Sequence, residues 1–575
     1  MKSWWQEHPE RLEYELEALR REGIAYKVDG AAKLAGQLRV TAWPLVNGEP
    51  TEVEATFPDL YPEFRFDVTS RQLQLDRHQH RLGGNLCLIG RRTENWAYDD
   101  TLAIYLVEKL PELVRAVAEG PGSLREEPQA EPESDYFSYE PGAAVVIDGS
   151  WRIPGEVSAG TIEIALLSPF PWDGSPLRGV ALQVSGSDGT VLLQTDARLG
   201  NVLSGAPTIL GRWVRLGLLP DAYADPATFR EHLRRTMNVG SERGLLNPNS
   251  GRAIEVVAGV FPEEHAWPTQ RGDGWVFLVS QRSMKGKKPQ IRRYFCRVER
   301  AGPSDVTSRV ADEHLFADRR VAIFGLGALG APIAKELNKV GLAGLNLNDP
   351  DRVDPGTSSR TPYGLFQAGL PKPAALAQTI IAHLPYTEIK MWALRVGAVR
   401  PMDGPHEVTI LNEILDRVDL VVDATAEIGV QMTLSRICRE RRIPCVLVSA
   451  TPGAWGGTVA HFQPDTNGAC ALCWAWARRS DSNLSPPAAP GPGIQPPGCA
   501  DPTFTGTGYD LAEISMQGVR AICDILQGRP PKWNVAICSL RDRETGERVM
   551  PRWSELVVPR HPSCGRCWDG GLSPQ

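Results

Sequence analysis

Apolar and polar residues alternate along the chain in two different ways. Residues 9–23 carry apolar side chains at a helical spacing with charged residues between them, which predicts an amphipathic helix. Strand-like segments follow at 38–43 and 53–57, and a second helical run covers 102–118. From about residue 304 onward, strand and helix patterns alternate, which predicts a parallel sheet covered by helices.

A polar linker and a β-rich segment separate these two regions. Residues 120–140 are rich in Pro, Glu and Ser, which predicts a linker. Residues 141–303 contain short β-like runs, a helical stretch near 226–237 and no chemical motif, which favours a β-rich spacer or docking domain. We therefore expect domains at 1–119, 141–303 and 304–575.

Length, charge and cysteine usage narrow the class of protein. The chain has 575 residues, enough for about three or four domains. Its net charge of −7 argues against a general nucleic-acid binder, and no apolar run reaches the roughly 18–20 residues that span a bilayer. The charged and aromatic residues 1–8 are unlike a signal peptide, so we expect a cytoplasmic protein. Eleven cysteines in a reducing compartment then indicate metal ligation or catalysis, not disulfides.

A glycine-rich loop after a strand-like segment is the most informative chemical feature. The run 321–324 leads into Gly325, Gly327 and Gly330. Such glycines let backbone N–H groups approach a phosphate at a helix N-terminus. Asp349 follows the next predicted strand, where a carboxylate bonds ribose hydroxyls. An NAD site fits this pattern as readily as an ATP site.

Two cations further along the chain favour ATP. Arg360 and Lys372 follow Asp349 by 11 and 23 residues. When a carboxylate attacks the α-phosphate of ATP, negative charge grows on the phosphoryl oxygens and on the departing pyrophosphate, and fixed cations stabilise it. An NAD site gives these residues no role; the alternative is that both are solvated surface charges.

Two Cys-x-x-Cys pairs predict a structural zinc site. The pairs are Cys470 with Cys473 and Cys564 with Cys567, and together they supply the closed tetrahedral thiolate shell that Zn²⁺ takes. A metal bound here would hold the C-terminal tail to its domain. A redox role or a chance pairing is the alternative, but a redox motif needs only one pair.

Two other cysteines have the setting of nucleophiles. Cys499 ends the Pro/Gly-rich stretch 480–498, where a core role is poorly supported, and its thiolate could convert an acyl-adenylate into a thioester. We expect a helix to begin just after it, at Asp510, with Glu513 in a capping box. Cys87 is the second candidate nucleophile, and the alternative for it is a cysteine buried in a strand. The remaining cysteines lie in apolar runs and are expected in the core: Cys296, Cys438, Cys445, Cys523 and Cys538.

Residues 319–376 resemble the adenylation domain of ubiquitin-activating enzymes and their ThiF/MoeB-type bacterial relatives. The Asp-x-Asp step of that family is Asp349-Pro350-Asp351 here, its arginine is Arg360 with different neighbours, and its Gly-x-x-Lys is 369–372. The resemblance covers most of 304–575. It implies ribose binding by Asp349, phosphate binding by Arg360 and Lys372, a structural zinc, and a catalytic cysteine on a crossover loop where Cys499 stands.

One departure from that family concerns Mg²⁺. The family has a strand that ends in an aspartate near the phosphates, and here that position is Ala426. Asp423 and Glu427 are the neighbouring carboxylates that could take over the metal, and a different metal position is the third alternative. We keep Asp423 as the cofactor-binding residue.

Residues 1–118 resemble ubiquitin-conjugating enzymes. The order is an N-terminal helix, a sheet, Phe57-Pro58-x-x-Tyr61-Pro62, a Gly-x-x-Cys-Leu step at Cys87, and Trp96 before a helix. The resemblance implies that Cys87 is an acyl-accepting cysteine. The His-Pro-Asn step of the family is missing, since the local sequence is Arg77-His78-Gln79-His80, and Gln79, His80 and Asn85 remain alternatives for its asparagine.

The whole layout resembles bacterial fusions of a conjugating and an activating enzyme, of the type found in antiphage CBASS operons. It implies an α+β N-terminal domain, a β-rich middle domain and a Rossmann-like ATP-binding adenylation domain with zinc. The implied activity activates the C-terminus of a ubiquitin-like protein or a cGAS-like nucleotidyltransferase, relays it through Cys499 and Cys87, and joins it to a target amine.

The implied cofactors are ATP, Mg²⁺ and Zn²⁺, and the implied assembly is a homodimer without nucleic-acid or membrane partners. Two alternatives stay open. One is a sulfur-carrier adenylyltransferase with an inactive N-terminal domain. The other is a non-catalytic nucleotide-binding scaffold.

Overall fold

The computed structural model divides the chain into two compact units. The first comprises Met1–Thr195 with Gly205–Arg300, and the second comprises Asp196–Ser204 with Ala301–Gln575. The structure describes residues 3–80, 83–88, 96–120, 130, 132–167, 175–217, 225–236, 245–247, 252–265, 271–285, 288–399, 404–464, 468–491, 493–494, 503, 505–565 and 567. Among the described helices, none combines the length and the apolar character that crossing a membrane requires.

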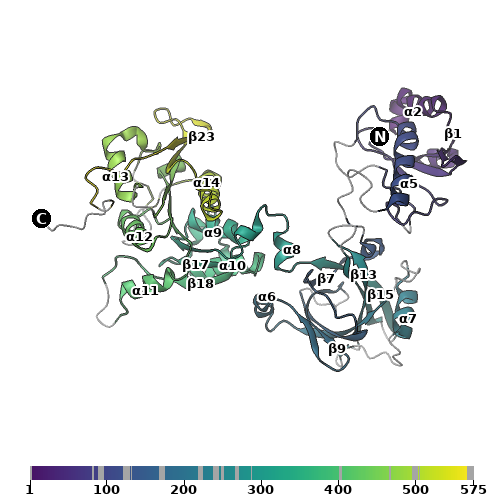
Figure 1. The fold of residues 1–575 in the computed structure, drawn as a ribbon, viewed down its shortest axis with the longest axis horizontal. Helices are drawn as coiled ribbons and strands as arrows, with labels where there is room; N and C mark the ends of the chain where they lie inside the picture. The colour runs from purple at the N-terminus through teal and green to yellow at the C-terminus, as the bar shows by residue number, and fades with distance from the viewer. Residues whose placement is uncertain are drawn as a thin grey trace. The chain divides into compact units, whose positions relative to one another are not determined.

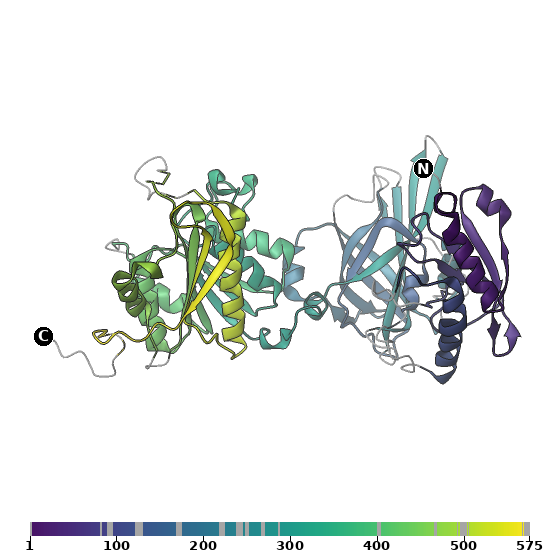
Figure 2. The same ribbon diagram turned by 90° about the horizontal axis from the view of Figure 1, so that it is seen from above.

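The first unit begins with a helix, an antiparallel sheet and a second helical segment, drawn in purple to dark blue in Figures 1 and 2. The sheet has the order β1-β2-β5-β6, and consecutive strands pair antiparallel. The elements are α1 (Trp4–Glu7), α2 (Pro9–Arg21), β1 (Ala25–Val28), α3 (Gly30–Leu34), β2 (Leu38–Trp43), β3 (Leu45–Val46), β4 (Glu49–Pro50), β5 (Val53–Phe57), β6 (Asp67–Thr69), α4 (Leu102–Ile104), a π-helical stretch (Tyr105–Lys109) and α5 (Leu110–Glu119).

A buried hydrogen-bond network around Glu15 connects α2 to the start of α4. Alternate residues of β2 and β5 face the core, as the period-two pattern of their sequences predicts. Within this core the Glu15 carboxylate accepts hydrogen bonds from Arg11 at 2.8 Å, from the backbone N–H of Leu102 at 2.9 Å and from the Tyr61 hydroxyl. Because a buried charge is costly unless paired, this network fixes α2 against α4.

The remainder of the first unit is a β-barrel. Its strands have the order β10-β9-β7-β15-β14-β13-β11-β8, and the additional pairing of β8 with β9 closes the sheet. Trp213, Trp275 and Phe277 are fully buried within its core. The elements are a 3-10 turn (Glu133–Tyr136), β7 (Tyr139–Ile147), β8 (Ala159–Leu166), β9 (Arg178–Gly186), β10 (Val191–Gln194), β11 (Thr208–Arg215), α7 (Pro226–Thr236), β12 (Leu245–Asn247), β13 (Arg252–Glu264), β14 (Arg271–Lys285) and β15 (Lys288–Arg300).

The second unit is a mixed sheet between two layers of helices. The sheet order is β18-β17-β16-β19-β20-β21-β22-β23, parallel from β18 to β20 and antiparallel beyond. Its strands are β16 (Arg320–Phe324), β17 (Gly344–Asn348), β18 (Glu388–Trp392), β19 (Leu420–Asp423), β20 (Cys445–Ala450), β21 (Gly456–Phe462), β22 (Val535–Arg541) and β23 (Arg548–Leu556). Its α-helices are α6 (Ala197–Val202), α8 (Pro303–Thr307), α9 (Gly330–Lys339), α10 (Lys372–His383), α11 (Glu407–Ile414), α12 (Ile428–Arg441), α13 (Ala471–Ser480) and α14 (Gly508–Leu526).

The two helix layers of this unit bury different residues. Side chains of α9, α10 and α14 pack on one face of the sheet, and those of α11, α12 and α13 pack on the other. Figure 2 shows α14 in yellow beside β23, to which it is joined by a 3.0 Å hydrogen bond from Trp553 Nε1 to Glu513. The chain runs from β16 outward to β17 and β18 and then returns to β19 on the other side of β16. This reversal makes a topological switch point at the carboxyl end of β16, where open α/β sheets bind ligands.

The predicted start of the helix after Cys499 is wrong by two residues, and its predicted capping box is wrong. Helix α14 begins at Gly508, two residues before the predicted Asp510, and its N-cap is Thr507. Glu513 therefore makes no capping box and instead accepts from Trp553. The stretch 480–498 also contains a short 3-10 turn, Ser482–Leu484, because Asp481 accepts a hydrogen bond from the backbone N–H of Asn483.

Candidate functional site

The three predicted loop glycines differ in how closely other atoms surround them. Gly325 has φ +83°, and a Cβ on it would lie 2.7 Å from the backbone carbon of Ala424. A Cβ on Gly330 would lie 1.9 Å from the carbonyl oxygen of Gly325. A Cβ on Gly327 would meet no atom of the described residues within 4 Å. Gly325 and Gly330 therefore shape the loop, while Gly327 leaves room beside it.

Asp349 is the residue that joins the second strand to this loop. The ends of β16, β17 and β19 lie in register, since Phe324 pairs with both Asn348 and Asp423. Asp349 follows β17 and is 4% exposed. Its Oδ2 accepts the backbone N–H of Leu326 at 2.6 Å, so the carboxylate holds the loop in place. Tyr363 completes the contact by donating its hydroxyl to the carbonyl of Leu326 at 2.7 Å.

Lys372 lies beside Asp349, as the predicted site requires. It is the first residue of α10, and its Nζ is 3.5 Å from Asp349 Oδ2 and 3.0 Å from Asp351 Oδ2. Arg395 Nη2 lies 3.3 Å from the other oxygen of Asp351. No role was predicted for Asp351, Tyr363 or Arg395. The Asp-x-Asp motif was a signal for Asp351, whereas only the fold brings Tyr363 and Arg395 to the site.

The backbone of Arg360 lies against the start of α14. Its N–H donates to the carbonyl of Thr357 at 3.0 Å within a 3-10 turn (Pro355–Thr357). A Cβ on Gly508 would lie 3.0 Å from the Ser359 carbonyl oxygen and 3.3 Å from Arg360 Cα. The first residue of α14 is therefore in close contact with the segment that carries the arginine.

Asp423 ends β19 directly beside the glycine loop, and it is fully buried. Its Oδ1 accepts the N–H of Thr425 at 2.9 Å and the Thr425 hydroxyl at 2.7 Å. Its Oδ2 has no hydrogen-bond partner among the described residues. Burial raises the pKa of Asp423 to about 6, and the charge of Glu427 adds to that rise. Ala426, at the position of the family aspartate, has φ +59°.

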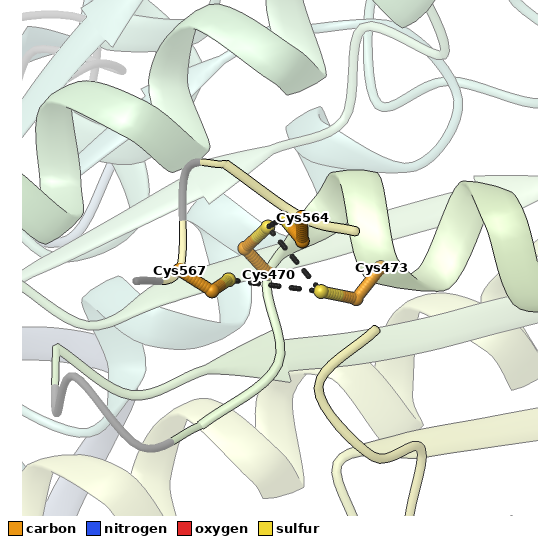
Figure 3. A group of neighbouring side chains, drawn as sticks. All are labelled: Cys470, Cys473, Cys564 and Cys567. Carbon is orange, nitrogen blue, oxygen red and sulfur yellow. Dashed lines mark hydrogen bonds between the residues drawn. The ribbon is translucent and has the colours of Figure 1, made fainter. Parts of the chain in front are cut away.

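The four cysteines of the two Cys-x-x-Cys pairs converge in the structure. Cys470 and Cys473 lie at the start of α13, and Cys564 and Cys567 come from the C-terminal segment (Figure 3). All four are buried, and their sulfur atoms lie within 4.8 Å of one another. The Sγ–Sγ distances are 3.8, 3.7 and 3.6 Å for the contacts 470–473, 470–564 and 473–567. Four sulfurs about 2.3 Å from a tetrahedral Zn²⁺ would be about 3.8 Å apart, so the cluster fits zinc.

Hydrogen bonds among the sulfurs favour one thiolate in the cluster, at Cys473, and a hydrogen bond with Cys473 raises the pKa of Cys470 to about 11. Hydrogen bonds from Cys470 and Cys567 hold the pKa of Cys473 far below its usual range, and the N–H of His561 adds a 3.4 Å contact to the same sulfur. The N–H of Ala471, beside Cys470, donates to the Ser435 hydroxyl at 3.2 Å, which fixes α13 against α12. A zinc ion bound here would connect the C-terminal segment to the helical layer of the second unit.

Cys87 is exposed and lies on a loop of the first unit. Its N–H donates to the carbonyl of His78 at 2.8 Å. An isolated bridge pairs Leu86 with Gln79, and another pairs Asn85 with Thr69. The alternative of a buried strand cysteine is therefore wrong for Cys87. Its exposure is what a nucleophile needs.

Gln79, one of the alternatives for the missing asparagine, has a structural role. Its Nε2 donates to the carbonyls of Ser70 at 2.8 Å and Leu73 at 2.9 Å, and its Oε1 accepts the N–H of Leu75 at 2.8 Å. The residue is 7% exposed. Because both ends of its amide are engaged, Gln79 holds the loop that precedes Cys87. Asn85 is exposed, and His80 Nδ1 accepts the N–H of Gly83 at 2.8 Å.

Cys499, the predicted nucleophile, lies outside the described residues. The five cysteines predicted to lie in the core are buried, except Cys523, which is half-buried. The structure thus brings together Asp349, Lys372 and the glycine loop by direct contacts, and it forms the zinc cluster separately, at the start of α13.

Comparison with known proteins assigns a family to the second unit. Residues 307–508 match the ThiF family. Ubiquitin-like modifier-activating enzyme 5 of Drosophila erecta is 29% identical over 171 residues, which are 28% of this chain and 41% of that protein. Among solved structures, E. coli MccB with ATP covers 44% of this chain and 68% of its own, at 12% identity and a TM-score of 0.34.

Two relatives match along nearly the whole chain. Protein y4qC of Sinorhizobium fredii (strain NBRC 101917 / NGR234) is 31% identical over 572 residues, which are 94% of each chain. Protein y4oA of the same strain is 28% identical over 602 residues, covering 98% of this chain and 97% of its own. The chain therefore belongs to the family of y4qC, and it carries a ThiF-family domain at residues 307–508.

Proposed function

We propose that the second unit adenylates the C-terminal carboxylate of a protein substrate with ATP. The observation that carries this proposal is the set of contacts among Asp349, Lys372 and the glycine loop, with open space at Gly327. A ribose-binding carboxylate, a fixed cation and a glycine loop that leaves its backbone N–H groups accessible at a helix N-terminus are the parts that ATP needs. The ThiF match and the relative named as a modifier-activating enzyme support the same activity.

The reaction begins with attack by a substrate carboxylate oxygen on the α-phosphorus of ATP. The new O–P bond forms as the bond to pyrophosphate breaks, which gives an acyl-adenylate and pyrophosphate. Lys372 and Arg360 stabilise the charge on the phosphoryl oxygens and the leaving group. Asp349, freed from Lys372 by the incoming phosphates, keeps its second role of orienting the loop through Leu326.

The proposed next steps move the acyl group through two cysteines. The Cys499 thiolate attacks the acyl carbonyl, and AMP leaves with the bonding electrons. The Cys87 thiolate then attacks the Cys499 thioester and releases the Cys499 thiolate. Finally the amine of a target lysine attacks the Cys87 thioester, forms an amide as the Cys87 thiolate leaves, and loses its proton. The two thioester stages keep the activation that ATP supplied until this amide forms. The exposure of Cys87 supports this order, since it must meet two different partners.

The residues present also fit a magnesium ion. The Oδ2 of Asp423 has no hydrogen-bond partner among the described residues, and Glu427 lies close enough for its charge to affect Asp423. We assign Mg²⁺ to these two carboxylates in place of the family aspartate. Bound there, the ion would neutralise charge on the ATP phosphates.

The proposed substrate is a ubiquitin-like protein or a cGAS-like nucleotidyltransferase with an exposed C-terminus, in an antiphage setting. Its test is intact mass under non-reducing conditions, after co-expression with the proteins encoded beside this chain and addition of Mg-ATP. We expect a thiol-sensitive adduct that is absent in Cys499→Ala and is confined to Cys499 in Cys87→Ala. Asp349→Asn should abolish both adducts.

Other outcomes of that measurement would overturn the proposal. An unchanged adduct in Cys87→Ala, with transfer to its final acceptor intact, would favour a sulfur-carrier adenylyltransferase with an inactive N-terminal domain. ATP binding without AMP release would favour a nucleotide-binding scaffold. We also propose a homodimer through the adenylation domains; light scattering at micromolar concentration should give twice the mass of 63.0 kDa, and a strict monomer would contradict it.

A further inference from the structure

The carboxyl end of β13 in the barrel is where three distant segments of the first unit meet. β13 ends in two consecutive glutamates, whose side chains point to opposite faces of the strand. Glu263 accepts the N–H of Ser134 at 3.0 Å and pairs with Arg300 at 2.7 Å. Glu264 pairs with Arg77 at 2.5 Å. One strand end therefore contacts the segment that precedes the barrel, the last residue of the first unit, and the N-terminal region.

The contact between Arg77 and Glu264 lies in a packed interface. The two residues are 187 positions apart in the sequence. Their side chains are only 12% and 11% exposed, whereas in the pairs Arg20–Glu13, Arg39–Glu54 and Arg436–Glu440 both side chains are at least 40% exposed. Burying two charges requires that the surrounding atoms exclude water, because otherwise the charges would stay hydrated. The barrel surface and the N-terminal region are thus in direct contact at this point.

Arg77 belongs to the loop that holds Cys87. The next residue, His78, accepts the N–H of Cys87 at 2.8 Å through its carbonyl. The residue after that, Gln79, bonds three backbone groups of the same loop and bridges to Leu86. A displacement of Arg77 would therefore pass through one residue to the backbone of Cys87.

The opposite side of the interface is equally well anchored. Glu264 is preceded by Glu263, which is 2% exposed, and followed by His265, whose ring contacts Arg152 at 3.3 Å and Arg300 at 3.1 Å. A Cβ on Gly272, the β14 residue paired with Glu263, would lie 2.6 Å from the His265 ring. The side chains around Glu264 have little freedom to move, so the barrel presents this carboxylate from a fixed position.

We propose that the carboxyl end of β13 is a docking surface for the Cys87 loop, and that Arg77 is a positioning residue for Cys87. The barrel would then be a support for the thiol and not a spacer between two catalytic regions. The proposal rests on the proposed function only for the role of Cys87 as an acyl acceptor. The docking itself stands on the contact between Arg77 and Glu264.

The test is a charge exchange in the full-length protein. The variants are Arg77→Glu, Glu264→Arg and the double variant with both changes. The first readout is hydrogen–deuterium exchange of peptides covering 76–88. The second is the rate of alkylation of Cys87 by iodoacetamide, measured by mass spectrometry as a function of pH. Neither readout requires ATP or a protein substrate.

Each single reversal places two like charges in a buried contact, so we expect it to release the loop. Deuterium uptake of 76–88 should rise, and the alkylation rate should change by roughly fivefold, a usual size of coupling for residues in contact. The double variant should restore both values to within about twofold of wild type. Arg39→Glu is the matched control, because Arg39 pairs with Glu54 in the same N-terminal region at 3.8 Å and these side chains are 40% and 43% exposed. This variant should change neither readout.

Unchanged uptake and alkylation in both single reversals would overturn the proposal. So would a double variant that stays as defective as the single ones while its melting temperature equals that of wild type. If a reversal prevents folding, Glu264→Gln and Arg77→Gln replace it, and they should raise uptake without adding a like charge. If the exchange experiment succeeds but no thioester forms on Cys87 with Mg-ATP and the neighbouring proteins, the docking holds and the proposed function alone fails.

Discussion

The substitution Gly330→Ala tests whether the glycine loop has the geometry described. A Cβ at this position would lie 1.9 Å from the carbonyl oxygen of Gly325 and 3.2 Å from Ala424 Cβ. Both neighbours belong to the packed ends of β16 and β19, so the backbone itself would have to move. Overpacking of this kind costs about 1–3 kcal/mol. At roughly 2–4 °C per kcal/mol for a unit of this size, the melting temperature of the second unit should fall by about 2–12 °C.

Gly327→Ala is the matched substitution within the same loop. Its Cβ meets no atom within 4 Å, so the fold should tolerate it and the melting temperature should stay within about 2 °C. The new methyl group would occupy the space assigned to the phosphates, so ATP affinity should fall, by about tenfold. Calorimetric melting of the full chain and titration with Mg-ATP measure the two effects separately. A Gly330→Ala protein that melts like wild type, or a Gly327→Ala protein that binds ATP like wild type, would refute the reasoning.

Three further predictions concern the other sites. Cys564→Ser should reduce bound zinc from about one ion per chain to none in elemental analysis and expose the C-terminal segment to protease, because structural zinc needs all four thiolates; unchanged zinc content would contradict the cluster. The pKa of Asp423 is raised to about 6 from an ordinary 3.8. The protonated carboxyl therefore contributes most to the free energy of unfolding below about pH 4, and this contribution is lost as the pH rises to about 6. Without added metal, Asp423→Asn should therefore match wild type at pH 4 and be more stable at pH 7.5 by up to about 3 kcal/mol in denaturant unfolding; equal stability at both pH values would contradict the raised pKa. Gln79→Ala should cost about 1–3 kcal/mol and increase hydrogen exchange at 70–87, because it leaves buried backbone groups unpaired; unchanged exchange would show that the amide is dispensable.

Elements with a strong local period were predictable from the sequence. The strands expected at 38–43 and 53–57 are β2 and β5 with the same bounds, since alternate residues face one core. The helix expected at 9–23 spans Pro9–Arg21. The glycine loop and the helix after it were also predictable, because the conformation at Gly325 and the close contact at Gly330 require glycine, which the sequence shows directly.

Features that depend on contacts between distant segments were not predictable. The pairing of β8 with β9 closes the barrel, but nothing in either strand indicates its partner. Helix α6 lies within the barrel sequence yet belongs to the second unit, where Arg198 packs on the ring of Tyr386. The start of α14 was misplaced because the Thr507 hydroxyl, which bonds Asp510 at 2.6 Å, moves the N-terminus by two residues.

The same distinction applies to the site. The closeness of Asp349 and Lys372 was predictable because both belong to a spaced motif, and the structure places them 3.5 Å apart. The contact of Arg77 with Glu264 crosses 187 residues and has no sequence signal. The Oδ2 of Asp423 has no hydrogen-bond partner among the described residues. This could be found only from the structure, because the sequence shows no more than an aspartate at the end of a strand.

The measurement that tests the central claim most directly is exchange of labelled pyrophosphate into ATP. The full chain would be mixed with Mg-ATP and the candidate substrate protein encoded beside it, and Lys372→Ala and a substrate without its last residue would serve as controls. Adenylation predicts that label enters ATP with the wild-type pair and falls to background in both controls, because only reversible formation of an acyl-adenylate exchanges pyrophosphate. ATP binding without exchange, or release of phosphate in place of pyrophosphate, would contradict adenylation by this unit.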